Sequence, residues 1–274
     1  MAGEFGGRGG RARLGGVSFQ HILVDVAGPV ATITLDRPEK RNTLALAVIT
    51  ELTRALGEVS TTTATGVVIA ANGPVFSAGH DFAEMAGASI EDARRLFNAC
   101  TEMMDTVQSI PQVVIARVHA LATAAGCQLV ATCDLAVAAE SASFAIPGGK
   151  GGLFCHTPLV AVARNIGRKR ALEMALTGDP ISADAAAEWG LINYAVPDEE
   201  LHTATAELLA RATRGSVLSK ATGKHGFYEQ VRMDQKSAYA FAVELMAGAA
   251  MTADAQEGIA AFLAKRKPNF TERP

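Results

Sequence analysis

The stretch GVVIAANGPVFSAGHDFAEM, residues 66–85, decides the fold and contains a strand that ends in a turn of small residues. Its first part, GVVIAAN, is rich in β-branched side chains and predicts a buried strand. The small residues Ser77, Ala78 and Gly79 follow, and they allow a tight turn with an exposed backbone N–H group. The sequence therefore predicts a strand whose end presents backbone rather than side chains.

A second junction of this kind lies in VVIARVHALATAAGCQLVATCD, residues 113–134. The strand VVIARV leads to Ala124, Ala125 and Gly126, where we expect a helix to begin, with free N–H groups at its positive end. Either set of small residues alone is explained by close packing of a strand on a helix. Two N–H donors aimed at one point would instead form an oxyanion hole, which stabilises negative charge on a reacting oxygen.

Strands and helices alternate around these junctions. The runs HILVDVA and VATITLD, joined at Gly28, predict a hairpin, and apolar residues at helical spacing predict a helix over 43–58. Ser89 and Asp92 resemble a capping box at the start of a long helix, and a further strand is expected at 134–140. This order predicts an α/β fold with parallel strands.

The last third of the chain is poor in strands. After Gly178 we predict helices over 182–189, 199–213 and 235–265, with one short strand at 191–196. Such a region is suited to association with other subunits.

Length and charge narrow the class of protein. The 274 residues carry a formal charge of −3, which gives no reason to expect a nucleic acid or an anionic membrane as a partner. No uninterrupted apolar run is long enough to span a bilayer, so we expect a soluble protein. A length of 274 residues allows one large domain with a helical appendix.

The cysteines and the N-terminal residues bear on where in the cell the protein is located. The separations of Cys100, Cys127, Cys133 and Cys155 match neither a CxxC redox pair nor a zinc site, so we expect free thiols, no metal and a cytoplasmic location. Residues 1–16 are rich in Gly and Arg, and they predict a disordered tail. An RGG-like RNA contact and an Arg-rich transit peptide remain alternatives for this tail.

Six collinear segments between about Phe19 and Phe270 resemble the crotonase superfamily, the enoyl-CoA hydratase/isomerase family. They are RPEKRNTL (37–44), FSAGHDFAEM (76–85), AAGCQLVATCDLAVA (124–138), the segment 144–147 before a Gly-rich loop, ALEMALTGDPISADAAAEWGLIN (171–193) and GIAAFLAKRKPNF (258–270).

The resemblance implies a fold and an assembly. It implies a crotonase-like spiral of β-β-α repeats over 17–200, followed by a C-terminal helical trimerisation region over 201–274. Trimers, or hexamers built as pairs of trimers, would act on acyl-CoA thioesters, with coenzyme A entering as part of the substrate and no separate cofactor.

The resemblance also implies site residues. Ala78 and Ala125 would supply the two oxyanion N–H groups. The residues expected to contact the substrate or its CoA moiety are Arg37, Lys40, Ser77, Ala78, Gly79, His80, Asp81, Gly126, Phe262 and Lys265, the last two from the same or a neighbouring subunit. The basic clusters RPEKR and AKRK fit a nucleotide phosphate, although each alone is equally typical of a solvated surface. Asp81 is also typical of a turn or cap residue.

The chain departs from the family at the acid/base positions. A hydratase uses two glutamates, and these positions correspond to Gln128 and Gly148. Gln128 can orient a water but cannot take its proton, and Gly148 has no side chain, so we expect classical hydration to be weakened by roughly 10⁴- to 10⁸-fold. We predict that restoring both glutamates raises hydration. His156, after the Gly-rich loop, is a candidate replacement base.

Several reactions therefore remain open. The family resemblance predicts an enzyme that stabilises an enolate or oxyanion, with weak hydration, isomerisation, decarboxylation or thioester hydrolysis as possible outcomes. The alternative is a non-catalytic acyl-CoA-binding or assembly protein with the same fold.

Overall fold

The computed structural model describes residues 18–274, and the predicted tail at 1–16 lies outside this part of the chain. The elements of the first half are β1 (Ile22–Ala27), β2 (Val30–Leu35), η1 (Pro38–Lys40), α1 (Leu46–Ser60), β3 (Gly66–Ala71), α2 (Phe82–Met85), α3 (Ile90–Ser109), β4 (Val113–Val118), β5 (Ala122–Thr123), α4 (Ala125–Thr132), β6 (Leu135–Ala139) and β7 (Ser143–Ala145). Those of the second half are η2 (Pro147–Gly151), α5 (His156–Asn165), α6 (Arg168–Thr177), β8 (Ile181–Ser182), α7 (Ala183–Trp189), β9 (Tyr194–Val196), η3 (Asp198–Glu200), α8 (Leu201–Thr213), α9 (Val217–Gln230), α10 (Gln235–Ala250) and α11 (Ala253–Leu263).

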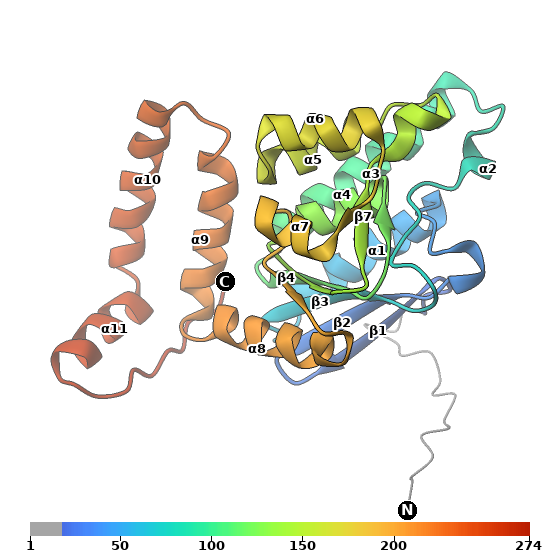
Figure 1. The fold of residues 1–274 in the computed structure, drawn as a ribbon. Coiled ribbons are helices and arrows are strands. Elements are labelled where there is room, and N and C mark those ends of the chain that lie inside the picture. The colour runs from blue at the N-terminus through green and yellow to red at the C-terminus, as the bar shows by residue number, and fades with distance from the viewer. Residues whose placement is uncertain (1–17) are drawn as a thin grey trace, which may run out of the picture.

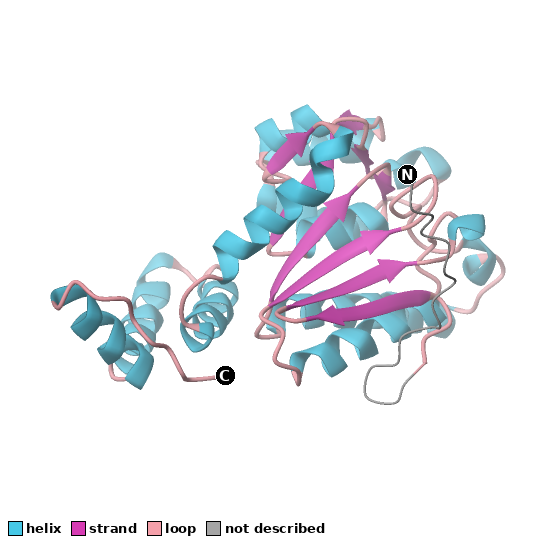
Figure 2. Cartoon of the chain, turned by 90° about the horizontal axis from the view of Figure 1, so that it is seen from below, coloured by secondary structure: helices cyan, strands magenta, loops and turns pink. Residues whose placement is uncertain are grey.

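The central sheet has six strands in the order β1-β2-β3-β4-β6-β9. Figure 2 shows its long strands lying side by side. Only the β1–β2 hairpin is antiparallel, and the remaining neighbours are parallel. A smaller sheet of order β5-β7-β8 lies beside it. Because parallel strands end at the same edge, the segments after β3 and β4 leave the sheet next to each other. The predicted α/β class is thus confirmed.

Both faces of the sheet are covered. The larger core joins the sheet to α1, α3 and α4, and its buried side chains include Ile33, Leu52 and Met103. On the other face, Ile115 and Val137 pack against Leu208 and Leu209 of α8. Figure 1 shows α8 beside the sheet, on the side away from α1 and α3. Strands buried on both faces explain why GVVIAA reads as a continuous apolar run.

Helix boundaries follow their caps. Ser89 accepts a hydrogen bond from the Asp92 N–H at 3.1 Å, so the predicted cap of α3 is confirmed. The helix predicted over 43–58 begins three residues later, at Leu46. The helix predicted over 235–265 is two helices, because Thr252 caps a new one through the Ala255 N–H.

Helix α9 was not predicted from the sequence. It contains Gly223 and Gly226, and its buried residues in the described monomer are the small Ala221 and Gly226. Its Lys224 side chain is long and largely buried, but it is polar. The helix therefore has no continuous apolar stripe that would mark it as a helix. Gly226 allows close approach of α10, since a Cβ there would lie 2.2 Å from a methyl carbon of Leu245.

The C-terminal boundary also differs from the prediction. Helix α8 covers the sheet and belongs to the core, whereas α9, α10 and α11 project from the body as an arm (Figure 1). The arm therefore begins after α8 rather than at residue 201. No helix in residues 18–274 is both long enough and apolar enough to cross a membrane.

A buried ion pair fastens the arm to the core. The Lys224 ammonium on α9 lies 2.8 Å from the Asp134 carboxylate and donates to the carbonyl oxygens of Val107 and Gln112, each at 2.8 Å. Asp134 also accepts from the Tyr228 hydroxyl at 2.8 Å. Burial raises the pKa of Asp134 and lowers that of Lys224, because removal from water disfavours both charges. Each charge is therefore tolerated only while its partner is present.

We predict that Lys224→Met lowers the free energy of unfolding by about 3–5 kcal/mol, because it leaves the Asp134 carboxylate buried without its counter-charge. Lys220→Met, at an exposed position of the same helix, should change it by less than about 0.5 kcal/mol. Urea unfolding followed by circular dichroism measures both. Equal effects of the two substitutions would contradict this account of the ion pair.

Candidate functional site

The two strand-to-turn junctions predicted from the sequence meet in space. Ser77 forms a parallel bridge with Ala122. The Phe76 N–H donates to the Leu121 carbonyl at 2.9 Å, and the Thr123 N–H donates to the Ser77 carbonyl at 2.9 Å. The turn after β3 is therefore joined by backbone hydrogen bonds to the segment that leads into α4.

Two glycines allow this contact. A Cβ at Gly79 would lie 2.8 Å from the Ala124 Cβ and 3.2 Å from the Ala125 nitrogen, and Gly79 has a φ of +81°. A Cβ at Gly126 would lie 2.6 Å from the Ser77 carbonyl oxygen. Any side chain at either position would force the two backbones apart.

The Ala125 N–H group is free, as predicted. Ala125 is the first residue of α4, and among residues 18–274 its N–H has no hydrogen-bond acceptor. The group lies at the positive end of the helix. The preceding residue, Ala124, has a φ of +51° and is held by its N–H bond to the Ala145 carbonyl at 2.8 Å.

The prediction for Ala78 was wrong. Its N–H group donates to the Arg41 carbonyl at 3.0 Å and is not available to a ligand. The N–H of Gly79 lies 3.3 Å from the Ser77 hydroxyl oxygen. The next group along the turn, the His80 N–H, has no acceptor in the described chain. The N–H groups of His80 and Ala125 are thus free in the described chain, as is that of Gly126, the second residue of α4.

The Arg41 contact depends on Asn42, a residue that the sequence analysis missed. Asn42 is 1% exposed, and its amide donates to the carbonyl oxygens of Asn72 at 2.7 Å and Val75 at 3.0 Å. Its carbonyl accepts from the Ser77 hydroxyl at 2.8 Å. Arg41 and Asn42 both have φ near +50°, a conformation that Asn tolerates better than most residues, and this preference was the available signal.

Asp81 follows the turn and acts as a cap. Its carboxylate accepts from the Ala83 N–H at 3.0 Å at the start of α2. The turn-and-cap interpretation of Asp81 is confirmed, while a contact with substrate stays a prediction.

Gln128 lies on α4, one turn after Ala125. The residue is 5% exposed, and its Oε1 is buried without a hydrogen-bond partner in the described chain. The Thr123 hydroxyl, next to the start of the same helix, is also buried without a hydrogen-bond partner. Both atoms lie on the segment that carries the free Ala125 N–H, so this region contains polar groups that no other described residue satisfies.

His156 does not share this environment. It is the first residue of α5 and is exposed, with its ring 5.0 Å from that of Phe154. A base in a water-excluded site needs burial, so the monomer does not support His156 in that role.

The loop around Gly148 leaves no room for the glutamate that the sequence resemblance implies at this position. A Cβ there would lie 2.0 Å from the Leu153 carbonyl oxygen and 2.7 Å from the Cys155 sulfur. The Gly148 N–H donates to that sulfur at 3.2 Å, and its carbonyl accepts from the Leu153 N–H at 2.9 Å. A side chain at Gly148 therefore requires this loop to move, and the expectation that restoring both glutamates raises hydration stays a prediction.

The cysteines beside the site are poor nucleophiles. All four cysteines are free and buried, as expected. Burial raises the pKa of the Cys127 thiol to about 12 and also raises that of Cys155, so neither is a thiolate near neutral pH.

The predicted CoA contacts lie in two places. Arg37 is the N-cap of η1 and Lys40 is its last residue, and η1 leads into the Arg41–Asn42 turn beside the junctions. Phe262 is 83% exposed on α11 of the arm, and Lys265 follows that helix, away from the sheet (Figure 1). One chain does not bring Phe262 and Lys265 to the junctions. In residues 18–274 no group of three His, Cys, Asp or Glu side chains is placed to hold a metal ion.

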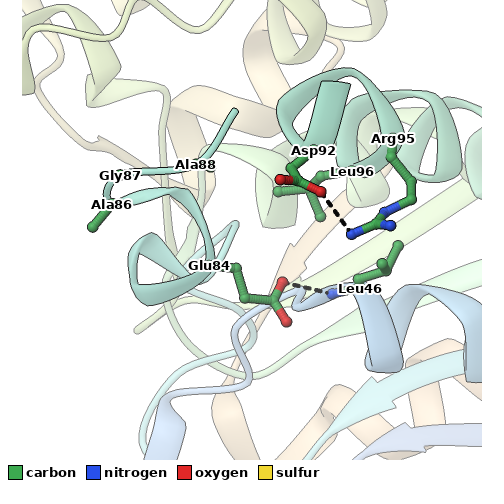
Figure 3. A pocket seen from close by; sticks show the side chains of 8 residues that line it. All are labelled: Leu46, Glu84, Ala86, Gly87, Ala88, Asp92, Arg95 and Leu96. Atoms are coloured by element: carbon green, nitrogen blue, oxygen red, sulfur yellow. Dashed lines mark hydrogen bonds and ion pairs between the residues drawn. The ribbon is translucent and has the colours of Figure 1, made fainter. Parts of the chain in front are cut away.

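A small pocket lies between the starts of α1 and α3 and helix α2 (Figure 3). Glu84 accepts a hydrogen bond from the Leu46 N–H at 2.8 Å, and Asp92 pairs with Arg95 at 2.9 Å. The Glu84 contact joins α2, the helix that directly follows His80 and Asp81, to the start of α1.

We predict that Gly148→Ala lowers the free energy of unfolding by about 1–3 kcal/mol, because the added methyl group overlaps the Leu153 carbonyl. Gly151→Ala in the same loop meets nothing within 4 Å and should be close to neutral. Thermal unfolding of both variants measures the difference, and a Gly148→Ala protein as stable as Gly151→Ala would show that the loop adapts.

Comparisons with known proteins agree with this architecture. The family model described as enoyl-CoA hydratase/isomerase matches residues 25–273. Enoyl-CoA hydratase domain-containing protein 3, mitochondrial, from mouse is 44% identical over 241 residues, covering 87% of this chain and 80% of the relative. The human protein of the same name is 42% identical over 247 residues, covering 89% and 82%.

Solved structures give the same result. A crystal structure of enoyl-CoA hydratase from Mycobacterium smegmatis has a TM-score of 0.89 and 44% identity, covering 92% of this chain and 99% of that one. That of human enoyl-CoA hydratase domain-containing protein 3 has a TM-score of 0.88 and 41% identity, covering 92% and 100%. The crotonase-like fold is therefore confirmed.

The same relatives correct one expectation and settle another. The mouse and human proteins are named as mitochondrial, which contradicts the cytoplasmic location inferred from the cysteines. Free thiols do not distinguish the cytosol from an organelle. The family expected from the six segments is confirmed by the extent of these matches, and the chain belongs to the enoyl-CoA hydratase/isomerase family.

Proposed function

We propose that this protein is an enzyme that binds an acyl-CoA thioester and polarises its carbonyl group through the N–H groups of His80 and Ala125. The observation that carries the proposal is that these two N–H groups are free on two backbone segments that touch at Gly79. Each donor is worth about 2.7–4 kcal/mol of transition-state stabilisation in a dry site. Family membership supports the thioester as substrate.

The reaction that fits these residues passes through an enolate. Withdrawal of a proton from the α-carbon of a saturated or 3-enoyl thioester, or from the γ-carbon of a 2-enoyl thioester such as crotonyl-CoA, places negative charge on the carbonyl oxygen, which two N–H donors stabilise. Addition of water by two glutamates is disfavoured, because Gln128 does not titrate and Gly148 has no room for a side chain. Proton exchange or double-bond migration requires only the oxyanion donors and one base.

A non-catalytic acyl-CoA-binding protein is the second candidate. The observation in its favour is that Gln128 and Gly148 occupy the two positions at which the family resemblance implies carboxylates. It predicts thioester binding without exchange of carbon-bound protons.

The experiment that separates these candidates is proton NMR of crotonyl-CoA in D₂O with a high concentration of the protein. Deuterium incorporation or a shifted double bond supports the proposed enzyme, and a strong β-hydroxyacyl signal would show that hydration survives with Gln128. A spectrum unchanged by a protein that binds crotonyl-CoA would favour the second candidate.

We predict that Gly79→Ala lowers the rate of this reaction by about 10²–10³-fold, because the added Cβ separates the two donors. Gly87→Ala is the matched control, since Gly87 also has a positive φ, +73°, but its Cβ would meet nothing within 4 Å. The two variants share the backbone strain and differ in crowding. Equal rates for the two would show that the spacing at Gly79 does not matter.

We further propose that the arm mediates self-association as a trimer or a pair of trimers. Helices α9, α10 and α11 enclose an apolar groove, and large apolar side chains such as Met246, 74% exposed, and Phe262, 83% exposed, remain uncovered in one chain. Exposed apolar surface of this extent is typical of an interface between subunits. Such an interface would also explain how Phe262 and Lys265 could reach the site of a neighbour.

We predict that Met246→Asp dissociates the assembly to smaller species, because a charge would be buried at the interface. Ile90→Asp, at an apolar position 60% exposed at the start of α3, is the control and should leave the assembly intact. Analytical ultracentrifugation measures both. A wild-type protein that sediments as a monomer would contradict the proposed assembly.

A further inference from the structure

The imidazole of His80 has one ring nitrogen fixed and the other free. Its Nδ1 lies 3.1 Å from the Leu44 carbonyl oxygen, and because a carbonyl only accepts, Nδ1 must carry the proton. In the neutral ring the lone pair then resides on Nε2. This atom is buried and has no hydrogen-bond partner in the described chain.

Packing keeps the ring in this orientation. Phe97 of α3 contacts it edge to face, with ring centroids 5.4 Å apart and an interplanar angle of 71°. Leu44, in the segment before α1, holds the opposite nitrogen. A buried acceptor without a partner is unfavourable, so the free Nε2 needs a structural or functional reason.

The location of His80 suggests that reason. His80 directly follows Gly79, whose backbone is packed against the Ala125 nitrogen. Five buried side-chain atoms of the described chain lack a partner, and three of them, on His80, Thr123 and Gln128, lie on the two segments that meet here. Unsatisfied polar groups therefore concentrate where the thioester would bind.

Burial favours the neutral form of the ring, against the effect of the charge that faces it. Burial lowers the pKa of His80, and this effect outweighs the opposing effects of the Leu44 carbonyl and the Glu84 carboxylate. Glu84 faces the ring from α2 and is held by the Leu46 N–H. On α3, Asp92 and Arg95 neutralise each other at 2.9 Å (Figure 3). The segment with Leu44 contributes a carbonyl and no charge.

We propose that the His80 imidazole is the general base of this site, with Nε2 removing a proton from the α-carbon of the bound acyl-CoA. The C–H electron pair becomes the enolate, whose oxygen accepts hydrogen bonds from the His80 and Ala125 N–H groups. The imidazolium then returns a proton, or a deuteron gained from solvent, to the carbon chain. The step needs no oxidant or reductant, and it rests on the proposed function.

The test is exchange of the α-protons of butyryl-CoA in D₂O, followed by proton NMR. His80→Asn retains an amide near the position of Nδ1 that can still bond to Leu44, and it removes the base. His80→Gln places an amide near the position of Nε2 that can form hydrogen bonds but does not titrate. We expect both to slow exchange by about 10²–10⁴-fold, whereas His202→Asn, at an exposed position on α8, leaves it unchanged.

The pH profile provides an independent readout. Wild-type exchange should be maximal at neutral pH and fall on acidification through a pKa below the ordinary value for histidine, since protonated Nε2 cannot act as a base. In both variants the exchange rate should no longer show this decrease on acidification.

Each outcome is decisive. Unchanged exchange in a His80→Asn protein that binds butyryl-CoA would overturn the role of His80 alone, and if that variant does not fold, His80→Gln answers the same question. Exchange retained by His80→Gln would also overturn it, because hydrogen bonding rather than proton transfer would then suffice. Absence of exchange by the wild-type protein would overturn this proposal together with the proposed function.

Discussion

The contact between the turn at 77–79 and the start of α4 is the constraint on which the site depends. It brings two backbones within the distance that a single Cβ would occupy, and it exists only because Gly79 and Gly126 have no side chains. The parallel neighbours β3 and β4 deliver the two segments to the same edge of the sheet. Hydrogen bonds among residues 76–77 and 121–123 then fix the spacing.

Three features convert this contact into a candidate reaction site. The Arg41 carbonyl occupies the Ala78 N–H, which leaves the donor two residues later, on His80, free. Asn42 holds that carbonyl in place through its own buried hydrogen bonds. The side chain of His80 is oriented by Leu44 and Phe97, so one residue offers both a backbone donor and an imidazole acceptor. Neither function requires the two glutamates that the family pattern places at Gln128 and Gly148.

The sequence predicted the architecture well where periodicity and small residues were informative. The parallel sheet, the cap at Ser89 and the free N–H at Ala125 follow from local patterns. Helix α9 escaped because its glycines and buried Lys224 serve contacts that only the folded chain reveals. The choice between Ala78 and His80 could not be made from sequence, because it depends on a hydrogen bond to Arg41, which lies 37 residues earlier in the chain. The same holds for Gly148, whose surroundings come from Leu153 and Cys155.

A crystal structure of the protein with butyryl-CoA tests the central claim most directly. The account predicts that the thioester oxygen lies about 2.7–3.2 Å from the backbone nitrogens of both His80 and Ala125. The Ala78 N–H should remain bonded to the Arg41 carbonyl. A thioester oxygen bound away from these two nitrogens, or held by the Ala78 N–H after loss of the Arg41 contact, would contradict it.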